Sequence, residues 1–308
     1  MQIAHSLEAR LTDRPTVLTI GKFDGVHLGH QRLVRTAVAR ARELGCLSAV
    51  LTFEPHPDVV IRPERELYLL TSLDERSELL GQLGPDLLVV APFSRETMST
   101  PAADYMRRIC AALPLRELWV GSDFALGRGR EGNVPRLREI GQDLGYTVGT
   151  VDPVELEGAP VSASRARQCL YAGDVQGVIP LLGRPFWVRG PVEEGDRRGQ
   201  TIGYPTANIA VAPVHALPAD GVYACQVYLD AEPLPAVTNV GTRPTFAGTR
   251  RTVEAHLLDW QGNLYGQTVR LVFLHHLRGE RKFSGIDELV AQIGRDAARA
   301  RELLRGEA

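Results

Sequence analysis

Residues 16–32, Thr-Val-Leu-Thr-Ile-Gly-Lys-Phe-Asp-Gly-Val-His-Leu-Gly-His-Gln-Arg, decide how the first half of the chain folds. Residues 16–20 are uncharged and either β-branched or apolar, which predicts a buried strand. Gly21 ends that strand, and apolar residues at helical spacing begin after His30. A strand that leads through a glycine-bearing turn into a helix brings free backbone N–H groups to the positive end of the helix dipole. The stretch therefore predicts a phosphate-binding junction.

Two histidines mark this junction. His27 and His30 lie three residues apart, so both imidazoles would face one side and could donate hydrogen bonds to one anion. Gly29 between them lets a ligand approach the backbone. His-x-Gly-His also fits two surface histidines at an ordinary strand–helix junction, and the chain has no Gly-x-x-x-x-Gly-Lys-Ser/Thr loop. Gly21, Asp24-Gly25 and the preceding strand nevertheless favour a nucleotide site.

Composition narrows the class of protein. The chain has 308 residues, enough for two domains with separate cores. Its 44% apolar and 23% charged residues are ordinary for a globular protein, and the formal charge of −2 does not indicate nucleic-acid or membrane binding. The four cysteines form no cluster with zinc spacing, which predicts reduced thiols. No signal-peptide pattern and no apolar run of about 20 residues occurs, so we expect a cytoplasmic protein.

The first half alternates strand and helix patterns. Helices are predicted at residues 30–44, from residue 71 or 72, and at 100–112, and strands at 16–20, 48–53, 87–90, 117–120 and 146–151. This alternation predicts a parallel sheet with helical crossovers. Ligands of such sheets bind beyond the carboxyl ends of the strands, where His27, His56 and Ser122-Asp123 fall.

The pattern changes at residues 181–185, Leu-Leu-Gly-Arg-Pro. A helical spacing of apolar residues from 285 to about 304 predicts a closing amphipathic helix. Before it, short alternating runs between Gly and Pro predict an antiparallel sheet or small barrel: 186–192, 221–229, 234–240, 251–259 and 267–274. We place the domain boundary near residue 183, which gives domains 1–183 and 184–308.

A second candidate phosphate element spans residues 162–170. Ser162 or Ser164 is suited to cap a helix, and Arg165 and Arg167 fall in its first turns. Arginine at that end opposes the helix dipole, and a bound phosphate would resolve the conflict. Taken alone, the segment fits a capped helix with exposed arginines better than a phosphate site.

The histidine and serine–arginine segments together resemble the nucleotidyltransferase superfamily that also includes class I aminoacyl-tRNA synthetases. More closely, residues 21–30, 53–57 and 162–167 resemble the adenylyltransferase half of prokaryotic bifunctional riboflavin kinase/FAD synthetases. This resemblance implies a Rossmann-like domain in which His27 and His30 hold the ATP phosphates and Arg165 and Arg167 neutralise the leaving pyrophosphate. It also assigns Gly21, Phe23, Asp24, Gly25, Gly29, Ser162 and Ser164 to the ATP phosphates, and Asp123 and Phe124 to the flavin nucleotide.

Three residues depart from the family pattern. Ala163 and Ala166 stand where the family has Ser and Ile in Ser-Ser-Thr-x-Ile-Arg, and Leu126 replaces an aromatic residue in the loop 121–127. These departures leave open an enzyme with a weak adenylyltransferase half.

Residues 195–208 are the other informative stretch. Gly199 and Gly203 allow a backbone-lined loop for ATP. If residues 206–209 are extended, Thr206 and Asn208 point to one face, and their oxygens suit Mg²⁺. Thr-x-Asn is also common in ordinary strands and turns.

Residues 199–208, 221–224, 239–246 and 253–256 resemble riboflavin kinases. That resemblance implies a small antiparallel β-barrel with ATP–Mg²⁺ on one side and riboflavin on the other. It assigns Glu254 as the base that takes the proton of the ribityl 5′-hydroxyl, although a lone strand carboxylate is often merely solvated. We interpret His256, His275 and His276 as structural.

The sequence thus predicts an α/β enzyme with a C-terminal antiparallel barrel and closing helix. Its hypothesised substrates are riboflavin, FMN and ATP with Mg²⁺, and we expect no nucleic-acid, membrane or protein partner. The alternatives are a riboflavin kinase with weak or lost adenylyltransferase activity and a non-catalytic flavin-binding regulator. Length and net charge disfavour a tRNA-charging enzyme.

Overall fold

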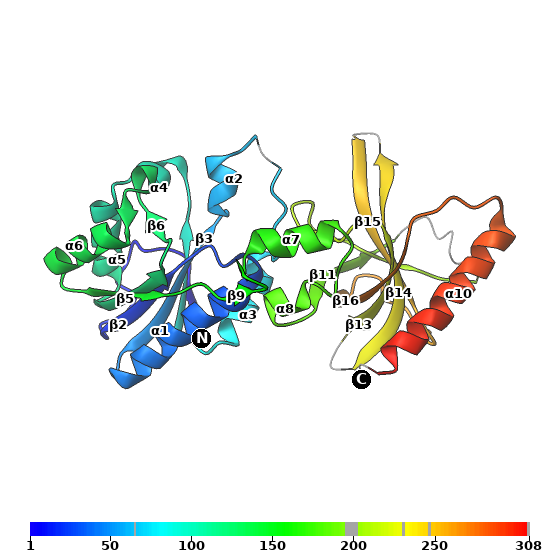
Figure 1. The fold of residues 1–308 in the computed structure, drawn as a ribbon, viewed down its shortest axis with the longest axis horizontal. Helices are drawn as coiled ribbons and strands as arrows, with labels where there is room; N and C mark the ends of the chain where they lie inside the picture. The colour runs from blue at the N-terminus through cyan, green and yellow to red at the C-terminus, as the bar shows by residue number, and fades with distance from the viewer. Residues whose placement is uncertain (65, 195–202, 230–231, 246–247, 307–308) are drawn as a thin grey trace. The chain divides into compact units, whose positions relative to one another are not determined.

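A computed structural model of the chain describes residues 1–308 except 65, 195–202, 230–231, 246–247 and 307–308 (Figure 1). Backbone contacts divide it into two compact units: Met1–Leu67 with Thr71–Ser162, and Tyr68–Leu70 with Ala163–Ala308. The short piece Tyr68–Leu70 joins the second unit because the Leu69 N–H donates to the Val214 carbonyl and its carbonyl accepts from Ala216, both at 2.7 Å.

The first unit is built on a parallel sheet, as the alternating pattern predicts. Its strand order is β1-β4-β3-β2-β5-β8, with every neighbouring pair parallel. The chain runs from β2 through β3 to β4 on one side and returns to β5 on the other, so the strand order reverses between β2 and β5. Ligands of such sheets bind at this switch point. The strands are β1 (Gln2–Ala4), β2 (Thr16–Ile20), β3 (Leu47–Glu54), β4 (Leu87–Pro92), β5 (Leu115–Gly121) and β8 (Thr147–Val151).

Helices cover both faces of this sheet because consecutive residues of a strand point to opposite sides. On β2, Val17 packs with α1 (Leu28–Glu43), whereas Leu18 belongs to the larger core that contains α5 (Ala102–Ala112) and α6 (Val134–Leu144). All five residues of β2 are buried, as their lack of charge predicts. The remaining helices of this unit are α2 (Pro57–Ile61), α3 (Leu73–Gly81) and α4 (Arg95–Ser99), with short 3-10 turns η1 (Asp24–Val26) and η2 (Arg128–Arg130).

Local signals account for the helix ends. The predicted capping box is present at α3: the Ser72 hydroxyl accepts from the Glu75 N–H at 3.2 Å, and the Glu75 carboxylate accepts from the Ser72 N–H at 2.8 Å. Helix α6 was not predicted, although Asn133 caps it by accepting from the Arg136 N–H at 3.0 Å. The short pairs β6 (Ala125–Leu126) with β7 (Gly132–Asn133) and β9 (Glu155–Leu156) with β10 (Ala159–Pro160) complete the unit.

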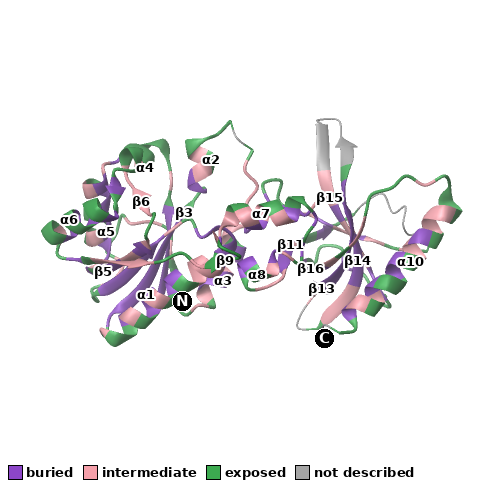
Figure 2. Cartoon of the chain, in the orientation of Figure 1, coloured by how far each residue is buried: buried purple, intermediate pink, exposed green. Residues whose placement is uncertain are grey.

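The second unit contains the predicted antiparallel barrel with its closing helix. The closed order is β11-β12-β15-β14-β13-β16, and α10 (Ile286–Leu304) packs on β13, β14 and β16. Figure 2 shows buried residues along the strands and alternating buried and exposed residues along α10. Strand β12 was expected only conditionally, since three residues are too few for a pattern. The strands are β11 (Phe186–Glu193), β12 (Ala207–Ile209), β13 (Gly221–Tyr228), β14 (Pro233–Thr245), β15 (Gly248–Leu257) and β16 (Thr268–Gly279).

Two helices precede the barrel in the second unit, α7 (Ala163–Tyr171) and α8 (Ile179–Leu182). In the part of the chain that the structure describes, we find no helix with the length and apolar character needed to span a membrane.

Candidate active sites

The segment from Gly21 to His30 follows β2 in an unusual backbone conformation. Phe23 and Val26 have φ angles of 53° and 41°, and Gly25 has φ of 71°. The left-handed region is rare for a β-branched residue such as valine, and it costs on the order of 1–3 kcal/mol. Strain of this kind concentrates at functional sites, which supports a ligand site here.

Buried polar contacts hold this loop. The Asp24 carboxylate is 3% exposed and accepts from the Thr71 N–H at 3.2 Å, while the Thr71 hydroxyl accepts from the Gly25 N–H at 3.0 Å. Phe23 is fully buried, and its ring meets His30 edge-on with ring centroids 5.2 Å apart. Asp24 and Phe23 therefore shape the loop with their side chains, and the contact of this loop with ATP remains a prediction.

The structure brings His27 and His30 together. Their rings stack with centroids 3.6 Å apart, and His27 caps α1 by accepting from the His30 backbone N–H at its Nδ1 (3.4 Å). An accepting Nδ1 places the proton of a neutral His27 ring on Nε2. The Nδ1 of His30 is buried and has no hydrogen-bond partner among the described residues.

Burial lowers the pKa of His30 well below its ordinary value, and the nearby His27, Arg76 and His56 lower it further. His30 is therefore uncharged at neutral pH, so it can bind phosphate by a directed hydrogen bond but adds no cation. The sequence analysis did not identify Arg76. A basic residue at a buried position of α3 is the signal that could have revealed it.

The loop after β5 holds the residues assigned to the flavin nucleotide. Asp123 is exposed, and its backbone carbonyl accepts from Arg130 Nη2 at 3.1 Å. Phe124 and Leu126 are half-buried and pack against the core of the first unit. Because β5 pairs with β2, this loop and the histidine loop leave the same edge of the sheet. The roles of Asp123 and Phe124 remain a prediction.

The serine–arginine segment forms a helix, as predicted. Ser162 directly precedes α7, and Ser164, Arg165 and Arg167 lie within its first five residues. The Arg165 and Arg167 side chains are half-buried, and Ala166 between them is fully buried. Ser162 belongs to the first compact unit and α7 to the second. The action of these residues on ATP remains a prediction from the resemblance.

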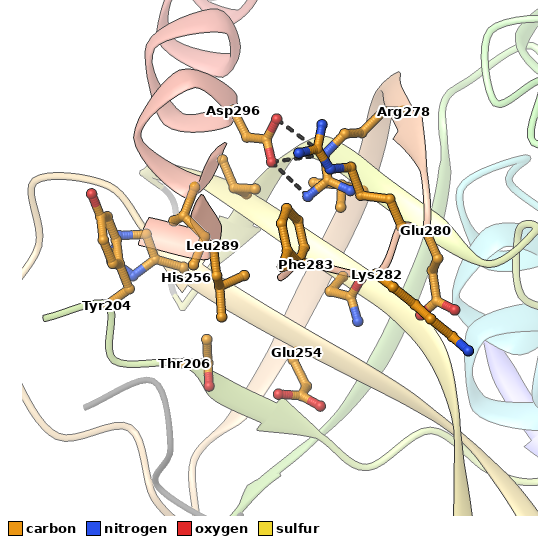
Figure 3. A pocket seen from close by; sticks show the side chains of 15 residues that line it. Tyr204, Thr206, Glu254, His256, Arg278, Glu280, Lys282, Phe283, Leu289 and Asp296 are labelled. Carbon is orange, nitrogen blue, oxygen red and sulfur yellow. Dashed lines mark hydrogen bonds and ion pairs between the residues drawn. The ribbon is translucent and has the colours of Figure 1, made fainter. Parts of the chain in front are cut away.

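The second unit contains a cavity of about 570 Å³ between one side of the barrel and α10. In Figure 3, Thr206 and Glu254 lie at one side, Arg278 and Asp296 lie at the other, and Phe283 stands between them. Its size falls within the range of small-molecule sites, roughly 300–1,000 Å³. It is lined by Tyr204, Thr206, Val222, Val237, Asn239, Glu254, His256, Arg278, Glu280, Arg281, Lys282, Phe283, Leu289, Ile293 and Asp296.

Strand pairing aligns the residues predicted for the kinase step. Asn208 lies directly opposite Glu254, which lies opposite Asn239 on β14. Directly opposite residues share one face of an antiparallel sheet. Thr206 precedes β12, whose Ala207 and Ile209 are buried, so Thr206 and Asn208 alternate with core residues as expected. Gly203 is exposed with φ of 84°, and Gly199 lies outside the described residues.

The donor set is chemically suited to Mg²⁺. The Thr206 hydroxyl, the Asn208 amide oxygen and the neighbouring Glu254 carboxylate are hard oxygen donors, and Mg²⁺ usually keeps waters and substrate phosphates as its other ligands. Within the described ranges, no group of three or more His, Cys, Asp or Glu side chains could hold a metal alone. A site that shares its ion with ATP is therefore the kind that these residues fit.

The sequence analysis did not assign a role in a binding site to Asp296, Arg278 or His256, which line the cavity. Asp296 of α10 is 6% exposed and accepts from Arg278 Nε and Nη2 at 3.0 and 2.9 Å. His256, interpreted as structural from sequence, lines the cavity and bonds the Pro205 carbonyl through Nδ1 at 2.8 Å. The Glu-x-His spacing on β15 could have revealed His256, but the Arg278–Asp296 pair joins elements far apart in sequence.

Comparison with known proteins identifies a family for each half of the chain. The family model for FAD synthetase matches residues 9–165, and that for riboflavin kinase matches residues 182–304. Proteins named bifunctional riboflavin kinase/FMN adenylyltransferase are similar throughout. The one from Escherichia coli (strain K12) is 38% identical and covers 93% of this chain and 92% of its own. The one from Pseudomonas fluorescens is 38% identical and covers 98% of each.

A solved structure shares the complete fold. The crystal structure of a protein described as a macrolide-efflux protein from Streptococcus pneumoniae matches with a TM-score of 0.89 and 31% identity, covering 97% of this chain and 98% of that one. With two family models in the expected order and relatives similar over nearly their full length, the chain belongs to the bifunctional riboflavin kinase/FMN adenylyltransferase family.

Proposed function

We propose that this chain makes FAD from riboflavin in two ATP-dependent steps at two separate centres. The first step phosphorylates riboflavin at the cavity that contains Thr206 and Glu254. The second transfers AMP from ATP to FMN at the loop that carries His27 and His30. The observation that carries this proposal is that one chain holds both a cavity with an aligned carboxylate and a stacked histidine pair at a sheet switch point.

In the kinase step, Glu254 acts as general base. It accepts the proton of the ribityl 5′-hydroxyl, whose oxygen then attacks the γ-phosphorus of ATP while ADP leaves. The apolar side chains of Phe283, Leu289 and Ile293 in the same cavity suit the flat flavin ring, which places the polar ribityl chain toward Glu254.

Thr206 and Asn208 would hold Mg²⁺ together with the ATP phosphates. When bound, the ion would supply positive charge that offsets the charge of these phosphates. The hydrogen-bonded pairing of β12 with β15 keeps Asn208 beside Glu254, so the donors and the base stay in one arrangement.

In the adenylyl step, an oxygen of the FMN phosphate attacks the α-phosphorus of ATP, and pyrophosphate leaves. This chemistry needs no protein nucleophile, so positioning and neutralisation of charge carry it. His27 and His30 would hold the phosphates, and Gly21, Gly25 and Gly29 would let them approach the loop without a Cβ atom in the way. Ser162, Ser164, Arg165 and Arg167 would bind the pyrophosphate side, and Asp123 and Phe124 the flavin nucleotide.

We assign adenylyl transfer to residues 1–183 and riboflavin phosphorylation to residues 184–308. This functional boundary keeps the serine–arginine segment with the histidine loop, although α7 belongs to the second compact unit. We also propose a cytoplasmic location, because both reactions consume ATP.

The deciding experiment is a product time course from riboflavin and ATP that resolves FMN from FAD. We expect FMN to rise first and FAD to follow. FMN that accumulates without FAD, even at high FMN concentration, would show a kinase with a lost adenylyltransferase half. Riboflavin binding without either product would show a flavin-binding regulator.

Two variants assign the steps to their centres. Glu254→Gln should lower phosphorylation by roughly a hundred- to ten-thousand-fold and leave FAD formation from FMN unchanged. His30→Ala should lower FAD formation by roughly ten- to a hundredfold, because it removes a hydrogen bond to a charged group. It should leave phosphorylation of riboflavin unchanged. If either variant affects both steps equally, the separation of the centres is wrong.

A further inference from the structure

Arg76 on α3 is unusually buried for an arginine: its side chain is only 1% exposed. Arginine is almost never fully buried unless its charge and its donors are satisfied. Nη1 donates to the Lys22 carbonyl at 3.0 Å, and Nη2 donates to the Phe53 carbonyl at 3.0 Å and to the Glu54 carboxylate at 2.9 Å. The guanidinium therefore binds two backbone segments and one acid through Nη1 and Nη2, whereas its buried Nε has no hydrogen-bond partner among the described residues.

These two segments lie at the carboxyl edge of the parallel sheet. Lys22 follows β2 and precedes Phe23, where the chain enters its left-handed turn, and Phe53 ends the buried part of β3. The Thr52 hydroxyl also donates to the Lys22 carbonyl at 3.2 Å, so it holds the same backbone position. The planar guanidinium of Arg76 thus links the loop that carries His27 and His30 to the neighbouring strand β3.

The start of α3 holds the same loop at a second place. Thr71, five residues before Arg76, bonds both the Asp24 carboxylate and the Gly25 N–H. The loop from Lys22 to Gly25 is therefore fixed at both ends by one short segment. This leaves its backbone little freedom to relax when either contact is lost.

We propose that Arg76 is a positioning residue for adenylyl transfer, which ties the loop after β2 to the end of β3 so that His27 and His30 face the ATP phosphates. This inference rests on the proposed function of the histidine loop. Arg76 itself is buried behind that loop, so it acts through the backbone it binds.

The charge of Arg76 adds a second, measurable effect. The charged or titratable groups that act on His30 are His27, Arg76 and His56, and the Arg76 cation helps to lower the His30 pKa. Removing this cation should raise the His30 pKa toward its ordinary value, because one source of repulsion for the imidazolium disappears.

The test compares Arg76→Met and Arg76→Lys in the full-length chain. Methionine keeps length and removes charge, and lysine keeps the charge but cannot form the fork. The control is Arg136→Met, which breaks an exposed pair with Glu139 on α6 of the same unit. For each variant, kcat and KM are measured for FAD formation from FMN and for phosphorylation of riboflavin, with a thermal melt to verify folding.

We expect Arg76→Met to lower kcat for FAD formation by roughly tenfold or more and to leave riboflavin phosphorylation unchanged. The control Arg136→Met should have the parental rate in both reactions. The kcat of Arg76→Lys for FAD formation should lie between that of Arg76→Met and that of the parent. A ring-carbon NMR titration of the histidines should show the His30 midpoint moved to higher pH in Arg76→Met and retained in Arg76→Lys.

Parental kcat for FAD formation in folded Arg76→Met overturns the inference, as does an unmoved His30 midpoint. Should Arg76→Met not fold, parental kcat in Arg76→Lys overturns it equally, because lysine cannot make all three contacts. If the parent chain forms no FAD, the proposed function fails instead, so the two failures are distinct.

Discussion

At the residue scale, the histidine site depends on a single missing Cβ atom. A Cβ built on Gly29 would lie 3.1 Å from Cε1 and 3.2 Å from Nδ1 of His27, closer than ordinary van der Waals contact. Because that Nδ1 accepts from the His30 N–H, a crowded ring would also disturb the cap of α1. Glycine at this position therefore preserves the orientation of the His27 ring and not only access for a ligand.

Gly29→Ala should separate activity from stability. Alanine is favoured over glycine within a helix by about 1 kcal/mol, which offsets the cost of a disturbed cap, so the free energy of unfolding should change little. FAD formation from FMN should fall because the His27 ring must move. The measurements are chemical unfolding and the rate of FAD formation. Gly294→Ala is a matched control, since nothing lies closer than 3.5 Å to its added Cβ; equal FAD formation in both variants would contradict the prediction.

At the scale of elements, the kinase cavity depends on how α10 is held on the barrel. Asp296 of α10 and Arg278 of β16 form a two-pronged ion pair, and Gln292 also donates to Asp296 at 2.7 Å. Both partners of the pair line the cavity. The pair therefore connects the stability of the helix to the shape of the site.

Asp296→Asn should weaken both the stability of the protein and the binding of riboflavin in the cavity. Loss of one partner from a largely buried ion pair costs about 3 kcal/mol, and the free energy of unfolding should fall accordingly. KM for riboflavin should rise more than kcat falls, because the wall of the cavity loosens while Glu254 stays in place. Urea unfolding and riboflavin kinetics check this. Glu302→Gln, which breaks an exposed pair with Arg299 on the same helix, should change neither.

At the scale of the whole molecule, the two candidate centres are built from different residues. The histidine pair lies in the first compact unit, and every residue that lines the kinase cavity lies in the second. A substitution in one centre should therefore leave the other intact, and two defective chains should complement each other.

A mixture of Glu254→Gln and His30→Ala chains should convert riboflavin to FAD. The His30→Ala chain supplies FMN, and the Glu254→Gln chain adenylylates it, after a lag while FMN accumulates in solution. Each variant alone should form far less FAD from riboflavin, which serves as the control. A mixture no better than either variant would mean that FMN does not pass between chains.

Much of the fold followed from local patterns. The uncharged run in β2, the capping box at α3 and the apolar spacing in α10 each act over a few residues, so the sequence displays them directly. Helix α6 was missed although Asn133 caps it, and β12 is too short for any period to be read.

The sequence by itself determined the class of both halves, the histidine junction and the kinase motif, because these features depend on neighbours along the chain. Only the tertiary structure decided that Arg76 joins the loop after β2 to the end of β3, that Asn208 lies opposite Glu254, and that Arg278 pairs with Asp296. These contacts join residues from separate elements, and their partners are chosen by strand register and helix packing. Local periodicity carries no information about either.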